Sequence, residues 1–77
     1  MRKPFFTETE LAALAKKFRE RAGKNKADVA RDLGVNRATI SRAEQKPERS
    51  LTSIRIRMIE AYSNLKVAGP FFTLHKK

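Results

Sequence analysis

Glycine and proline residues divide this chain into short segments. Gly23, Gly34, Pro47 and the pair Gly69-Pro70 fall between stretches in which apolar residues recur at intervals of three and four positions. That interval is the period of an amphipathic helix, and glycine and proline are the residues that most often end one. The chain has 77 residues and shows no repeat or linker, so the pattern predicts one domain of four short helices.

The first helix carries its own start and stop signals. Thr7 can accept a hydrogen bond from the third residue of the helix while Glu10 reaches back to the amide of Thr7, an arrangement called a capping box. Gly23 follows the last apolar position and can adopt the left-handed backbone that ends a helix. The apolar positions between these signals are Leu11, Leu14, Ala15, Phe18 and Ala22.

Two very short helices follow, separated by a tight turn. Asn25 and Asn36 are placed to cap their N-termini, and Gly34 lies in the turn between them. Such a pair, in which the second helix has a basic exposed face, is typical of a helix-turn-helix motif. The residues that point inward are Val29, Ala30, Leu33, Val35 and Ile40. The residues on the exposed face of the second helix are Arg37, Ala38, Ser41 and Arg42.

A fourth helix is predicted after a short polar stretch, with Ser50 as its N-cap. Its apolar side also includes Ile56 and Ile59, which make it wider than one small core needs. Arg55 and Arg57 fall on opposite sides of this helix, so only one of them is expected to face a phosphate. The apolar stripe itself consists of Leu51, Ile54, Met58, Tyr62 and Leu65.

The end of the chain differs from the helices. The pair Gly69-Pro70 turns the chain, and the segment 71–74 has the composition of an extended strand. The predicted fold class is therefore all-α, with four helices and a short C-terminal β-strand. The apolar end can cover the core or join two copies, and the sequence leaves both open. A dimerisation segment at 66–77 would give an interface made of Ile56, Ile59, Phe71, Phe72 and Leu74.

Several classes of function are excluded by what the chain lacks. It has no cysteine, and its single histidine, His75, stands close to the end. No paired carboxylates, nucleophile with a base, or phosphate-cradling loop stand out, so we predict no enzyme and no metal, cofactor or small-molecule substrate. The longest fully apolar run, Leu11 to Ala15, is far shorter than the roughly 20 residues that cross a bilayer. The chain is therefore predicted to be cytoplasmic, with no membrane span.

The charge of the chain indicates its partner. Eighteen Lys and Arg stand against eight Asp and Glu, which gives a formal net charge of +10 and a pI near 10.8. The excess is largest in residues 24–57, where nine positive side chains stand against four negative ones. A small domain with so large a positive charge is typical of a nucleic-acid binder. Charge alone would also suit a non-specific binder of nucleic acid or of an anionic membrane.

One segment resembles a known family. The string KADVARDLGVNRATISRAEQ, residues 26–45, resembles the helix-turn-helix of the Cro/C1-type family, also called XRE or lambda-repressor-like. The likeness extends over roughly residues 8–65. It implies a four-helix lambda-repressor-like domain that binds double-stranded DNA. The positions that match the family's pattern are Ala30, Gly34, Val35 and Ile40.

The resemblance implies roles for individual residues. Members of the family read base edges in the major groove from four exposed positions, which here hold Arg37, Ala38, Ser41 and Arg42. Arg19 and Glu44 match a pair that forms a structural salt bridge in many members.

Phosphate contacts are expected at both ends of the motif. Lys26 and Asn36 match positions that commonly hold phosphates in the family. Lys46, Arg49 and Ser50, at the start of the predicted fourth helix, would form a second phosphate clamp.

These features together predict a sequence-specific DNA-binding transcriptional regulator. On the resemblance, it is a Cro-like repressor that binds a palindromic operator as a homodimer. The competing hypothesis is an antitoxin or adaptor that binds a partner protein through its fourth helix and terminal segment, and autoregulates through its helix-turn-helix.

Overall fold

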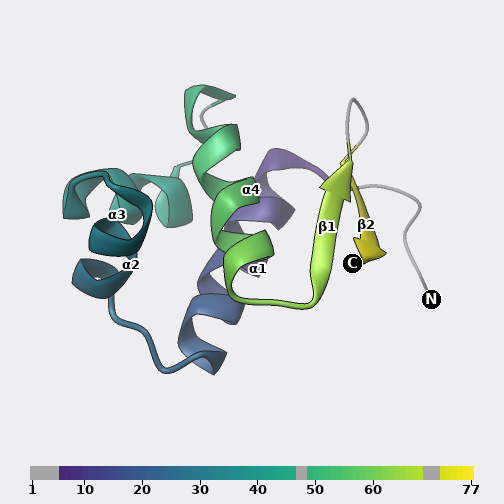
Figure 1. Ribbon diagram of the computed structural model, residues 1–77. Coiled ribbons are helices and arrows are strands. Elements are labelled where there is room, and N and C mark those ends of the chain that lie inside the picture. Colours follow the sequence, from purple (N-terminus) through teal and green to yellow (C-terminus); the bar gives the residue numbers. More distant parts are fainter. Residues whose placement is uncertain (1–5, 47–48, 69–71) are drawn as a thin grey trace.

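The computed structural model describes residues 6–46, 49–68 and 72–77. Within these ranges the chain forms four α-helices, one 3-10 turn and one antiparallel pair of strands (Figure 1), and no helix there is long and apolar enough to span a membrane. This confirms the predicted fold class and adds a strand that the sequence did not predict. The elements are α1 (Glu8–Arg21), α2 (Lys26–Leu33), α3 (Arg37–Gln45), η1 (Arg49–Leu51), α4 (Thr52–Ala61), β1 (Leu65–Ala68) and β2 (Thr73–Lys76).

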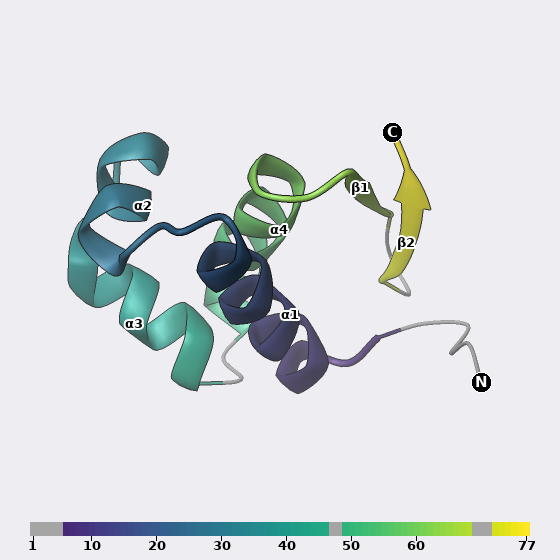
Figure 2. The same ribbon diagram turned by 90° about the horizontal axis from the view of Figure 1, so that it is seen from below.

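The short helix pair and the strand pair lie at opposite ends of the molecule. In Figure 1, α2 and α3 lie on one side of α4, and the strands lie on the other. The view from below in Figure 2 shows the same order, with α1 and α4 between the two ends. A partner bound to α2 and α3 would therefore leave the strands accessible to a second partner.

Side-chain caps begin the first three helices. Thr7 Oγ1 accepts a hydrogen bond from the amide of Glu10 at 3.2 Å, and Glu10 Oε1 accepts one from the amide of Thr7 at 2.9 Å. Asn25 and Asn36 each accept from the amide three residues further on, at 2.8 Å. The three predicted caps are thus confirmed. Asp28 completes a second capping box with Asn25, which the sequence reading did not include.

Glycine closes the first two helices, as predicted. Gly23 and Gly34 have φ angles of 71° and 72°, a left-handed conformation that disfavours residues with a side chain. At the end of α2, the amide of Gly34 donates to the carbonyl of Arg31 at 3.3 Å and the amide of Val35 donates to the carbonyl of Ala30 at 2.9 Å, so the turn supplies donors to carbonyls of the last helical turn. The angle between α2 and α3 is therefore set by a local hydrogen-bonded turn.

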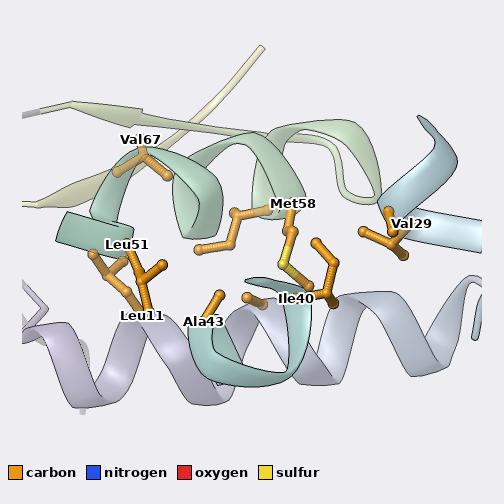
Figure 3. Close-up of a cluster of buried hydrophobic side chains, with 10 residues drawn as sticks. Leu11, Val29, Ile40, Ala43, Leu51, Met58 and Val67 are labelled. Atoms are coloured by element: carbon orange, nitrogen blue, oxygen red, sulfur yellow. The ribbon is translucent and has the colours of Figure 1, made fainter. Parts of the chain in front are cut away.

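The core lies between the helices, and every α-helix and β1 contribute to it. Figure 3 shows Leu11 of α1 and Leu51 close together, and Met58 of α4 pointing toward Ile40 of α3. Ile59 has no exposed surface, so its prediction as an interface residue is wrong: the core of this chain already surrounds it. The buried residues that form one cluster are Leu11, Ala15, Val29, Ala30, Ile40, Ala43, Leu51, Met58, Ile59 and Val67.

Both ends of α4 differ from the prediction. Ser50 lies in the 3-10 turn η1, and α4 has no side-chain N-cap, so the prediction that Ser50 caps it is wrong. The helix ends at Ala61, four residues before Leu65, which belongs to β1. Ser63 explains this end: its Oγ donates to the Ile59 carbonyl at 2.5 Å and accepts from the Leu65 amide at 3.1 Å. Such local side-chain bonds compete with continued helix.

The N-terminal segment contacts the strand pair through one isolated bridge. β1 and β2 are antiparallel, with Val67 opposite Leu74. Beyond β2, the Phe6 amide donates to the Phe72 carbonyl at 2.7 Å. Phe72, Leu74 and Ile56 are half-buried against the core, so part of their apolar surface is already used within the chain. Phe71, another predicted interface residue, lies outside the described residues.

A polar contact ties the end of α4 to α2. The Tyr62 hydroxyl donates to Asp32 Oδ2 at 2.6 Å. Burial of the phenol, and then its hydrogen bond to the carboxylate, raise the pKa of Tyr62 to about 12. The same hydrogen bond lowers the pKa of Asp32, and the charge of Lys24 adds to that effect.

This contact predicts a measurable titration. Tyr62 is the single tyrosine of the chain, so ultraviolet absorbance of tyrosinate reports it alone. We expect a midpoint near pH 12 in the folded protein, against about 10 in the unfolded chain. Since the folded pKa is the higher one, the contact stabilises the fold fully below about pH 10 and loses that effect as the pH rises toward 12. Asp32→Asn should lower the midpoint, and a parent midpoint near 10 would contradict the contact.

Candidate nucleic-acid interface

One face of α3 is exposed while the opposite face is buried. Ile40 and Ala43 have no exposed surface and fix the helix to the core. Residues advance by about 100° along a helix, so the predicted base-contacting positions lie within an arc of about 140° on the outer side. Three of these residues are exposed: Arg37, Ala38 and Arg42. The fourth, Ser41, is half-buried. The structure therefore brings the four predicted residues together on one surface.

Gln45 belongs to the same face and was missed in the sequence reading. It is exposed and follows Ser41 by four positions, so the two side chains neighbour each other on the helix surface. A glutamine amide can both donate and accept, as paired recognition of adenine requires. The helical spacing from Ser41 was the signal that could have found it.

The N-terminal ends of α2 and α3 carry two predicted phosphate-contacting residues. Lys26 is the first residue of α2 and is half-buried, and Asn36 is exposed immediately before α3. Asn36 Oδ1 accepts from both the amide and the hydroxyl of Thr39, at 2.8 and 2.9 Å. The cap uses the oxygen of the side chain, so its NH₂ group is the part suited to a phosphate oxygen.

The other predicted phosphate-contacting residues follow α3. Lys46 comes directly after the helix and Ser50 lies in η1, and both are exposed. Arg49 contributes its backbone to η1, while its side chain lies outside the described part of the chain. The start of α4 is thus a short 3-10 turn rather than a capped helix end.

Arg19 and Glu44 form a buried ion pair between α1 and α3. Arg19 Nε lies 2.5 Å from Glu44 Oε2, and its Nη2 lies 3.1 Å from the other carboxylate oxygen. The two side chains are 10% and 1% exposed. Arg19 Nη1 also donates to the Lys24 carbonyl at 2.9 Å. The hydrogen bond to Glu44 raises the pKa of Arg19 above its ordinary high value.

The two arginines of α4 lie in different environments, as expected for residues on opposite sides of the helix. Arg55 has no exposed surface and cannot reach a phosphate. Arg57 is exposed and donates to the Leu33 carbonyl at the end of α2, at 2.8 Å. Both side chains therefore hold other parts of the fold.

Comparison with known proteins agrees with this geometry. A family model described as a helix-turn-helix domain matches residues 10–61, which include α1 to α4 apart from the first two residues of α1. No curated protein and no solved structure matches the chain. The match covers more than half of the sequence and agrees with the Cro/C1-type resemblance. The chain therefore belongs to the helix-turn-helix family of DNA-binding regulators.

Proposed function

We propose that this protein is a sequence-specific transcriptional repressor that binds a palindromic operator as a homodimer, with α3 in the major groove. The observation that carries the proposal is the exposed face of α3, where Arg37 and Arg42 flank Ala38 and Ser41. Arginine offers a fork to guanine O6 and N7, while the Ala38 methyl group can contact a thymine methyl group. The face therefore carries groups that discriminate between bases as well as positive charge.

Contacts to the DNA backbone would hold this face in register. Lys26, Asn36, Lys46 and Ser50 come from both sides of α3 in the sequence, and each is at least partly accessible. Contacts to phosphates position a protein on the duplex without reading its sequence. We assign these residues, together with Arg49, to that role.

The homodimer is proposed because one helix of this size reads too few base pairs to select a site. Two copies related by a two-fold axis would read adjacent major-groove turns about 34 Å apart. The edge of β2 that faces away from β1 is the candidate interface. The backbone N–H and C=O groups of successive residues point alternately to the two edges of a strand. The backbone groups of Leu74 and Lys76 therefore point to the same edge as the Phe72 carbonyl, which accepts from Phe6. In the described ranges, Phe6 alone pairs with that edge.

Selection of bound sites from random duplexes tests the proposal. A palindromic consensus of two half-sites would support a homodimer, and a single half-site would contradict it. Sedimentation of the free protein measures the oligomeric state independently. Co-purification of a second small chain would favour the antitoxin or adaptor hypothesis instead. Loss of reporter expression from a promoter that contains the selected site would support repression.

Base reading predicts position-specific effects. Arg37→Ala or Arg42→Ala should each weaken binding to the preferred site by about 1 to 3 kcal/mol and relax the preference at one base pair. Lys26→Ala is the matched control, because a lost phosphate contact should weaken all sequences about equally. Competition titrations with single-base variants of the site measure both effects. If both arginine variants keep the parent's base preferences, the assignment is wrong.

A further inference from the structure

Arg55 is the largest completely buried side chain in the described part of the chain. Arginine is almost never fully buried unless its charge is paired, because removal of the charge from water costs free energy. The side chain extends from α4 to the start of α1 and to the end of α3. Because Arg55 is buried, it cannot act through direct contact with DNA as the exposed residues of α3 are proposed to do.

Within the described residues, the guanidinium group donates to one acidic side chain and two main-chain carbonyls. Nη1 donates to Glu8 Oε1 at 2.7 Å, and Nε donates to the Ala43 carbonyl at 2.8 Å. Nη2 donates to the Lys46 carbonyl. Glu8 is itself fixed, because Thr52 Oγ1 donates to the same oxygen at 2.8 Å.

These two carbonyls belong to the C-terminal end of the helix that faces DNA. The last carbonyls of a helix have no partner within it, and the negative end of its dipole attracts a cation. Arg55 supplies both donors and charge at that end, and so attaches it to α4. Arg19 attaches the same end to α1 through Glu44. Two arginines on two different helices therefore hold the last turn of α3.

We propose that Arg55 is a positioning residue for DNA recognition, which fixes the direction of α3 and the place of Arg42 and Lys46 through the carbonyls at 43 and 46. The inference rests on the proposed DNA-binding function of α3. A buried ion pair often adds little net stability compared with apolar side chains of similar volume. Base recognition, however, requires side-chain donors and acceptors to be placed within a few tenths of an ångström of hydrogen-bonding distance. The rigid fork of Arg55 meets that requirement.

The test separates positioning from stability. The double variant Glu8→Gln/Arg55→Met removes both charges and keeps an apolar side chain in the space. Arg55→Lys keeps a charge for Glu8, but one ammonium group cannot replace the three-sided fork. Leu14→Ala is the control, because Leu14 packs against the core from α1, about 140° around that helix from Arg19, which faces α3. For each folded variant, affinity is measured for the selected site and for random duplex, together with thermal unfolding.

We expect the ratio of specific to random affinity to fall about tenfold in the Arg55 variants, the equivalent of one misread base pair. The affinity ratio should stay unchanged in Leu14→Ala even if that variant unfolds at a lower temperature. The Lys46 amide, which donates to the Arg42 carbonyl at 2.8 Å, should also exchange its hydrogen faster without DNA in the Arg55 variants alone.

The outcomes are distinct. If the double variant does not fold, Arg55→Lys provides the comparison. An unchanged affinity ratio in a folded Arg55 variant overturns the positioning role. A parent protein without any site preference contradicts the proposed function, and the exchange of the Lys46 amide then decides whether Arg55 holds the end of α3.

Discussion

Arg19→Met should lower the free energy of unfolding by about 3 to 5 kcal/mol, because it leaves the Glu44 carboxylate buried without its counter-charge. Glu44 is only 1% exposed, so water cannot replace the lost partner. Small domains have a total stability of only about 5 to 15 kcal/mol, so the loss is a large part of the whole. Urea denaturation followed by circular dichroism measures it.

An exposed ion pair gives the matched control. Arg31 Nη2 lies 2.7 Å from Asp28 Oδ1, but the Arg31 side chain is 74% exposed. Arg31→Met should therefore cost less than about 1 kcal/mol. The double variant Arg19→Met/Glu44→Leu should recover much of the stability, since it removes both charges. If Arg19→Met is as stable as the parent, the pair does not hold α1 to α3 as described.

Affinity for duplex DNA should depend steeply on salt. If each of two copies places three or four cationic groups on phosphates, among them Lys26, Lys46 and Arg49, the slope of log affinity against log salt should be roughly −5 to −7. Affinity would then fall about 10³- to 10⁴-fold between 50 and 200 mM salt. Fluorescence anisotropy with a labelled duplex at several salt concentrations measures the slope. A slope near zero would contradict binding through phosphates.

A lysine on another surface separates specific contacts from net charge. Lys17 precedes Arg19 by two positions on α1, so it lies on the opposite side of the helix from the residue that faces α3. Lys26→Ala should reduce the magnitude of the slope by about one for each copy that binds. Lys17→Ala removes the same charge and should leave the slope unchanged. Equal changes in the two variants would indicate a diffuse electrostatic attraction.

Features that depend on neighbouring residues could be predicted from the amino-acid sequence. Thr7, Asn25 and Asn36 cap helices through bonds to amides three positions away, and Gly23 and Gly34 end helices through their own backbone freedom. These interactions are complete within one turn, so the boundaries of α1 and α2 and the start of α3 could be predicted. The exposed face of α3 followed from helical spacing in the same way.

Features that depend on partners far along the chain become visible only in the fold. The sequence shows Arg55 as one more basic residue, and only the fold brings Glu8 and the end of α3 to it, 47 and 12 positions away. Ile59 widens the apolar side of α4 in the sequence and so resembles an interface residue, but it is buried in the core of the chain. Leu65 fits the apolar period of α4, but in the fold it pairs with Lys76 of β2 and belongs to β1. Burial and charge pairing at these positions are set by contacts across the chain, which local periodicity does not contain.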